Sequence, residues 1–210
     1  DTGKLIHSAN QTFIDFNRSG VPLVEVVTEP DFVSSDDALV FLKELQAIVR
    51  ALDISSADME KGSMRLEANI SLRPADSAEL PNYKVEVKNV NSFRFIKKAI
   101  DFEIARQSHL LDSGVKPTQE TRGFSESKGE TVSQRSKEEA HDYRYFPEPD
   151  IPPFQFAPEQ IEKWRSELPK LPAQIHQELK TKYGLSDQYV QIIAADEKML
   201  KSFLANPTAS

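Results

Sequence analysis

The sequence predicts an α+β fold in which helices cover one face of an antiparallel sheet. Two segments, 62–74 and 84–88, alternate apolar and polar residues with the period of two that indicates a strand. Two further segments, 34–52 and 92–112, carry apolar residues at helical spacing. Helices that pack on one face of such a sheet leave its polar face free.

Composition excludes several classes of protein. The 210 residues suffice for one good core and a smaller second one. No apolar run is long enough to span a bilayer, so we expect no membrane partner. Because cysteine is absent, a metal would need carboxylate, amide or histidine ligands. The net charge of -7 argues against a chain coated in basic patches for nucleic acid, although it allows a local basic face.

The clearest strand lies within 62–74, whose apolar and polar residues fall on opposite sides. Its polar side is rich in functional groups: Arg65, Glu67, Asn69, Ser71 and Arg73. Carboxylate, carboxamide and guanidinium groups together suggest a function beyond solubility, although most polar strand faces only contact solvent.

The second strand, 84–88, is followed by residues 89–92, which predict a turn and then a helix cap. Val85 and Val87 point to its apolar side. If the two strands pair antiparallel, four polar residues share one surface: Glu67, Asn69, Glu86 and Lys88.

Two short apolar runs lie within 12–28, and Glu25 interrupts the second, Leu23–Val27. A buried carboxylate costs free energy unless it is paired, hydrogen-bonded or bound to a cation. Glu25 therefore either faces solvent from a half-buried strand or belongs to a site, and the nearby Asn17 and Arg18 favour a site.

Both long helices have clear ends. Ser34 or Ser35 is placed to cap the first, while Ser92 is placed to cap the second and Gly114 to stop it. We expect their apolar stripes to pack on the sheet.

The stretch 115–153 has little periodicity and is typical of surface loops and edge strands. Arginine beside glycine, as in Arg122–Gly123, lets a backbone approach a phosphate. If Arg135 and Arg144 converge there, they would form a clamp for an anion. His141 has no ligand spacing around it, so we expect no metal role for it.

After a proline-rich linker, 147–158, the pattern becomes helical. We expect three helices: 158–168, 172–183 and one capped by Ser186 and Asp187. The boundary near Phe154 predicts a sheet domain over 1–153 and the start of a helical domain over 154–210.

Five long segments closely resemble, in this order, the GatB family, the B subunit of the glutamyl/aspartyl-tRNA amidotransferase. They are DFNRSGVPLVEVVTEPDF, MEKGSMRLEANISLRP, KVEVKNVNSFRFIKKAIDFEIARQ, ETRGF and RSKEEAHDYRYFPEPDIPP. The resemblance covers most of 15–153 and continues weakly into the helical region. Five matches in one order are far more specific than one short motif.

The resemblance implies a glutamine synthetase-like catalytic core, an antiparallel sheet cradle flanked by helices, followed by a helical domain. It also implies an ATP-dependent, glutamine-hydrolysing aminoacyl-tRNA amidotransferase. Proteins of this family use ATP and Mg²⁺ to phosphorylate the side-chain carboxylate of Glu-tRNA(Gln) or Asp-tRNA(Asn). Ammonia from a partner amidase, the A subunit of the heterotrimer, then gives the amide, and a small C subunit completes the complex.

The resemblance implies a Mg²⁺ ligand at Glu25, within PLVEVV. The predicted polar face adds Glu67 and Glu86 as metal candidates. The candidate cations for the phosphates or the activated carboxylate are Arg18, Arg65, Lys88, Arg122 and Arg135. Candidate carboxamides for orienting the cofactor are Asn69, Asn89 and Asn91. The same residues could instead contact tRNA or pair along sheet edges.

In this family, further Mg²⁺ ligands lie upstream of the matched segments and a tRNA-binding tail lies downstream. We therefore expect an internal fragment with an incomplete site, inactive alone. Two alternatives are a non-catalytic tRNA-binding module and a partner-docking module; the carboxylates favour the enzyme, because they repel RNA phosphates unless a cation bridges them. Bacterial cytoplasm is the expected location, with an organelle matrix as the alternative, and the choice between Glu-tRNA and Asp-tRNA stays open.

Overall fold

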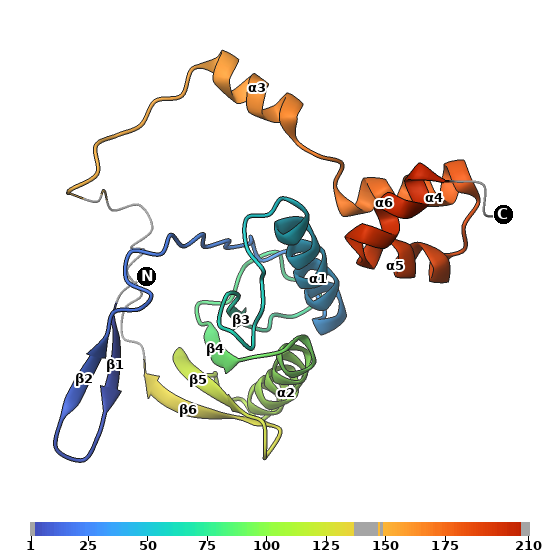
Figure 1. The fold of residues 1–210 in the computed structure, drawn as a ribbon. Coiled ribbons are helices and arrows are strands. Elements are labelled where there is room, and N and C mark those ends of the chain that lie inside the picture. Colours follow the sequence, from blue (N-terminus) through green and yellow to red (C-terminus); the bar gives the residue numbers. More distant parts are fainter. Residues whose placement is uncertain (1–2, 137–146, 148, 207–210) are drawn as a thin grey trace. The chain divides into compact units, whose positions relative to one another are not determined.

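The computed structural model describes residues 3–136, 147 and 149–206 of the chain (Figure 1). The chain divides into two compact units, Asp1–Val33 and Ser34–Ser210.

The first unit is built on a β-hairpin. Strand β1 (Lys4–His7) pairs antiparallel with β2 (Thr12–Asp15). The run Leu23–Val27 is not a strand, and its apolar side chains are exposed. The expected half-buried strand around Glu25 is therefore wrong. Pro22 lacks an amide hydrogen and the hairpin strands pair with each other, so this run has no ladder to join within its unit.

The second unit contains a four-stranded sheet in the order β3-β4-β5-β6. Its strands are β3 (Leu66–Ile70), β4 (Val85–Val90), β5 (Glu120–Ser125) and β6 (Glu130–Ser136). The outer pairs are antiparallel, as predicted for β3 and β4, but β4 and β5 are parallel. The fully antiparallel sheet is therefore wrong. The helix between β4 and β5 returns the chain to the end of the sheet where β4 began, and this connection makes the pair parallel.

The expectation of edge strands within 115–153 is confirmed for β6, which ends the sheet, and is wrong for β5, which lies between β4 and β6. Its sequence, ETRGFS, does not indicate that β5 is an interior strand. The charged residues Glu120 and Arg122 face the helix side of the sheet, where they are paired with other charges. An interior strand with a polar inner face does not show the apolar run expected of it.

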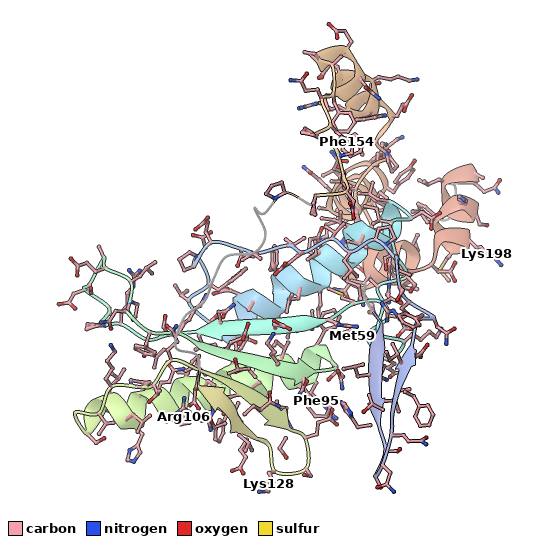
Figure 2. The ribbon with its side chains drawn as sticks, turned by 90° about the vertical axis from the view of Figure 1, so that its left-hand side faces the viewer. Met59, Phe95, Arg106, Lys128, Phe154 and Lys198 are labelled. Atoms are coloured by element: carbon pink, nitrogen blue, oxygen red, sulfur yellow. The ribbon has the colours of Figure 1, made fainter. Side chains whose placement is uncertain are left out.

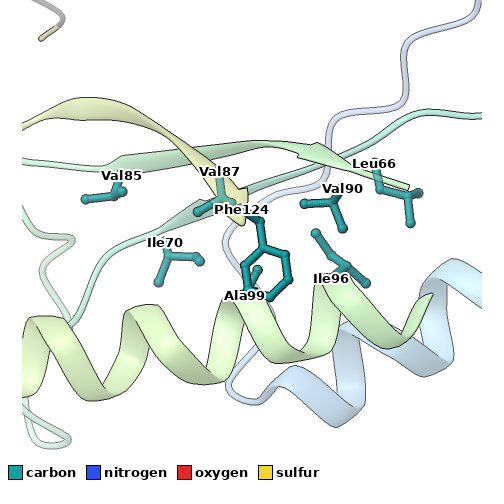
Figure 3. Packing of buried hydrophobic residues seen from close by; sticks show 8 residues of the cluster. All are labelled: Leu66, Ile70, Val85, Val87, Val90, Ile96, Ala99 and Phe124. Carbon is teal, nitrogen blue, oxygen red and sulfur yellow. The ribbon is translucent and has the colours of Figure 1, made fainter. Parts of the chain in front are cut away.

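Helices α1 (Ser35–Ala51) and α2 (Phe93–Asp112) lie on the same side of this sheet. Both begin as predicted, with the hydroxyls of Ser34 and Ser92 accepting hydrogen bonds from backbone amides in the first turns. The core lies between α2 and the sheet (Figure 3). It contains Leu66, Ile70, Val85, Val87, Val90, Ile96, Ala99 and Phe124. The opposite face, here called the open face, carries the alternating polar residues.

Two β-bulges interrupt the ladders beside β5. In β4, three residue steps from Val87 to Val90 match only two steps in β3, and Asn89 has a φ of 60°. In β6, Gln134 is the extra residue between Ser133 and Arg135. The turn expected over 89–92 is therefore wrong at its start, since Asn89 and Val90 still belong to the strand. The left-handed backbone of Asn89 is the turn-like feature that the sequence signals.

The C-terminal region contains α3 (Pro158–Glu167), α4 (Pro172–Tyr183), α5 (Asp187–Ala195) and α6 (Glu197–Ala205). The first two match the predicted ranges. The expected third helix is two helices, because Asp196 leaves the helical conformation and caps α6. The domain boundary near Phe154 stays a prediction. No described helix combines the length and apolar character that crossing a membrane requires.

Candidate functional site

The open face of the sheet collects polar side chains from β3 and β4. Asn69 lies directly opposite Glu86 in the antiparallel ladder. Val85 and Val87 point to the core, so Glu86 and Lys88 point away from it. The predicted common surface of Glu67, Asn69, Glu86 and Lys88 is confirmed.

Lys88 lies between two carboxylates on this face. Its Nζ is 3.3 Å from each carboxylate oxygen of Glu67 and 3.6 Å from Oε1 of Glu86. The side chains of Glu67, Lys88 and Glu86 are 46%, 33% and 13% exposed. The cluster carries one net negative charge, and its three groups remain reachable from solvent.

Glu86 is held from the neighbouring strand. Thr121 Oγ1 donates a hydrogen bond of 3.0 Å to Glu86 Oε2, and the two residues are register partners in the parallel ladder. Thr121 is 2% exposed. A buried hydroxyl therefore fixes one oxygen of this carboxylate, while the other faces Lys88.

The bulge in β4 determines where Asn89 points. Without the extra residue, Asn89 would follow the strand alternation to the core face. Instead its carboxamide lies within reach of Gly123 on the open face. Asn69 and Asn89 are both exposed, which leaves their amide groups accessible to a ligand.

The helix side of the same strands carries a different cluster, centred on Glu103 of α2. Glu103 is fully buried, yet the basic groups of Arg106 and Arg122 lie against it, at 2.8 Å and 3.1 Å. Thr131 also donates a hydrogen bond to this carboxylate, and Gln107 Nε2 lies 3.0 Å from it. Figure 2 marks Arg106 on α2.

These contacts determine the ionisation of Glu103. Burial alone would raise the pKa of this carboxyl, but hydrogen bonds from Arg106, Gln107 and Thr131 outweigh it, and the pKa is lowered. Glu103 is therefore ionised at neutral pH and joins α2 to β5 and β6.

Comparison with known proteins agrees with the sequence motifs. The family model described as the GatB/GatE catalytic domain matches residues 1–162. The chain belongs to the GatB/GatE catalytic domain family. Similar relatives are named as the B subunit of aspartyl/glutamyl-tRNA(Asn/Gln) amidotransferase. In Solidesulfovibrio magneticus the identity is 45% over 207 residues, which are 98% of this chain and 43% of the relative.

Two other bacterial relatives with the same name give a similar picture. The protein of Nitratidesulfovibrio vulgaris is 46% identical over 98% of this chain and 43% of its own length. That of Symbiobacterium thermophilum is 45% identical over 97% of this chain and 43% of its own length. The chain thus spans less than half the length of the relatives that it matches.

Within this GatB/GatE domain, the other predicted site residues belong to several different elements of the two units. Arg18 lies in the turn after the hairpin of the first unit, and Glu25 lies in the exposed segment of that unit. Arg65 is exposed just before β3, and Asn91 is exposed just before the cap of α2. Arg122 lies on the helix side, away from the open face, and its guanidinium is occupied by Glu103 and Glu120.

Arg135 lies in β6 opposite Thr121, which places its backbone beside the open-face cluster. His141 and Arg144 lie outside the described residues. The anion clamp predicted from Arg122, Arg135 and Arg144 therefore stays a prediction, and the placement of Arg122 does not favour it.

The open face suits a magnesium ion by its chemistry. Glu67 and Glu86 supply carboxylate oxygens, which Mg²⁺ prefers, and both already lie against one cationic group. Among the described residues, no three His, Asp or Glu side chains gather closely enough to form a complete metal site. The two carboxylates fit Mg²⁺ that keeps water and phosphate oxygens as its other ligands.

Sequence reasoning missed two residues next to this cluster, Thr121 and Gln134, and it named Gly123 only as the neighbour of Arg122. The register of β5 against β4 brings Thr121 to Glu86 and Gly123 to Lys88. The period of two of a strand places Thr121 and Gly123 on the same face of β5. Only the parallel pairing with β4 shows that this is the open face. The Gln134 bulge leaves no signal in the sequence.

Proposed function

We propose that this chain forms part of the catalytic domain of a tRNA-dependent amidotransferase. In this proposal, the whole protein uses ATP to phosphorylate the side-chain carboxylate of Glu-tRNA(Gln) or Asp-tRNA(Asn). Ammonia that the amidase, the A subunit of the heterotrimer, releases from glutamine then displaces the phosphate, and a small C subunit completes the complex. The observation that carries the proposal is the Glu67, Lys88 and Glu86 cluster on the open face of a domain of this family.

Phosphoryl transfer needs positioning and neutralisation of charge more than covalent help from the protein. Glu67 and Glu86 would hold Mg²⁺, and Glu25 is the further ligand that the resemblance to the family implies. Bound there, the ion would neutralise negative charge on the nucleotide phosphates.

The chain's own groups have distinct roles in this proposal. Thr121 orients Glu86 through their 3.0 Å hydrogen bond, so one oxygen keeps a fixed direction. Lys88, which lies beside both carboxylates, would contact a phosphate or the reacting carboxylate. Asn69, opposite Glu86, would donate hydrogen bonds to the same anionic groups.

For location, the named relatives are bacterial proteins. We propose the bacterial cytoplasm, with an organelle matrix as the alternative.

The test is calorimetric titration of ATP with Mg²⁺ into the whole amidotransferase, comparing wild type with Glu86→Gln. Because the substitution removes a proposed metal ligand but keeps the shape of the side chain, we expect Mg²⁺-dependent nucleotide affinity to fall about tenfold or more. Amide transfer to misacylated tRNA should fall with it. Glu126→Gln, in the exposed turn between β5 and β6, makes the same charge change away from the cluster and should have no effect.

Two results would decide against the proposal. Unchanged nucleotide binding and amide transfer in Glu86→Gln would remove the open face from the reaction. Salt-dependent tRNA binding that needs neither Mg²⁺ nor Glu86 would instead support the non-catalytic tRNA-binding alternative. Glu25→Gln, measured in the same titration, tests whether the first unit contributes a ligand.

A further inference from the structure

Two bulges, on strands that flank β5 on either side, converge on one glycine. Asn89 belongs to the bulge in β4 and Gln134 is the extra residue of the bulge in β6. Gly123 lies between them in β5, opposite Lys88 in the ladder. Bulges re-aim side chains and are frequent beside active sites.

Gly123 makes room for these two side chains. A Cβ at this position would overlap Nε2 of Gln134 and would lie 3.0 Å from its Cδ and 3.4 Å from Nδ2 of Asn89. Gly123 is not among the residues with positive φ, so its backbone accepts any residue. The absence of a side chain at position 123 therefore leaves space for the carboxamide of Gln134, which lies over β5 beside the carboxamide of Asn89.

The chemistry of this pair suits an anion. Each carboxamide carries two N–H donors and no charge. Within the part of the chain that the structure describes, neither side chain is engaged in a hydrogen bond. Lys88, in register with Gly123, brings the charged cluster next to the pair. Neutral donors beside a cation orient anionic oxygens without adding charge of their own.

We propose that Gln134 and Asn89 form a carboxamide pair over Gly123 that binds the oxygens of an anionic group. The group is a phosphoryl group of the nucleotide or the side-chain carboxylate of the aminoacyl-tRNA. This inference rests on the proposed function and adds Gln134 and Gly123 to its site.

Three variants of the whole amidotransferase test the pair: Gln134→Ala, Gly123→Ala and the double variant. The readouts are the Kd for ATP with Mg²⁺ and the KM for misacylated tRNA. We expect Gln134→Ala to raise one of them about tenfold, the loss typical of a hydrogen bond to a charged group. Gly123→Ala should have a similar effect, because its methyl group displaces the flexible end of Gln134 and leaves the fold intact.

The double variant separates the mechanism from a general disturbance. If Gly123→Ala acts through Gln134, the double variant should have the same Kd and KM as Gln134→Ala alone. If the two substitutions changed these constants additively, Gly123 would not act by making room for Gln134. Val132→Ala, an exposed truncation on the same strand opposite Gly123, is the matched control and should leave both constants unchanged. Gln134→Glu should be worse than Gln134→Ala, since it replaces donors by a negative charge.

The two readouts identify the ligand. A change in the Kd for nucleotide alone indicates the phosphoryl group, and a change in the KM for tRNA alone indicates the carboxylate. If Gln134→Ala and Gln134→Glu change neither constant while Glu86→Gln weakens nucleotide binding as expected, the pair is refuted and the proposed function stands. If wild type shows no Mg²⁺-dependent nucleotide binding, both proposals fall.

Discussion

Nε of Arg122 lies 3.1 Å from Oε1 of Glu103, which joins an interior strand of the sheet to the helix beneath it. The carboxylate is fully buried and the guanidinium is nearly so. Arg122 also contacts Glu120, at 2.7 Å, and donates to the backbone oxygen of Thr131. The sequence predicts that Arg122 binds a phosphate. In the structure, its guanidinium instead joins α2, β5 and β6.

Replacing Glu103 by alanine should strongly destabilise the protein. The change leaves the guanidinium groups of Arg106 and Arg122 beside an uncompensated cavity, and breaking a buried pair in this way costs about 3 to 5 kcal/mol. The free energy of unfolding in urea measures the loss. Glu103→Gln, which keeps the shape, should lose less, and the exposed Glu126→Gln should lose almost nothing. Equal stability of Glu103→Ala and wild type would mean that the cluster contributes nothing.

The stability difference between wild type and Glu103→Gln should depend on pH. The pKa of Glu103 is lowered in the folded protein from its ordinary value of 4.5, so its contribution is fully present above that value. It is lost as the pH falls through the folded pKa. The advantage of wild type over Glu103→Gln should therefore be large near neutral pH and shrink below pH 4.5. An advantage that grew on acidification would contradict the lowered pKa.

Substitutions at Asn89 should separate the effect of its backbone conformation on stability from the effect of its carboxamide on ligand binding. Asn89 has a φ of 60°, a conformation that glycine adopts freely and alanine adopts at a cost of about 1 to 2 kcal/mol. Asn89→Ala should therefore lower the free energy of unfolding by about that amount, whereas Asn89→Gly should change it little. Both variants lack the carboxamide, so both should weaken ligand binding alike. If Asn89→Gly kept full nucleotide and tRNA affinity, the amide would have no part in the site.

The N-terminal cap of α2 should be measurable on its own. Ser92 Oγ accepts a hydrogen bond of 3.2 Å from the amide of Phe95, and α2 covers the core face of the sheet. Ser92→Ala should lower the free energy of unfolding by about 1 kcal/mol, and Ser92→Asp should restore most of it. A loss in both variants would point to a role of the hydroxyl other than capping.

Much of the candidate site followed from local patterns. The alternation around Glu67 and Glu86 placed both carboxylates on one surface, because each strand's apolar residues could face only the core. Arg122 shows the limit of that reasoning. Its strand has charges on the helix side, so the sequence could not tell that its guanidinium meets the buried Glu103 of a distant helix.

The sequence by itself determined the helix cap at Ser92, limited the cap of α1 to Ser34 or Ser35, and favoured the antiparallel pairing of β3 with β4, since each depends on residues close together in the chain. It also determined the family, through five segments that match in one order. The tertiary structure alone decided the parallel pairing of β4 with β5 and the bulges at Asn89 and Gln134. Strand order and register depend on partners far along the chain, and one extra residue turns a side chain to the other face. The carboxamides over Gly123 are therefore visible only in the folded protein.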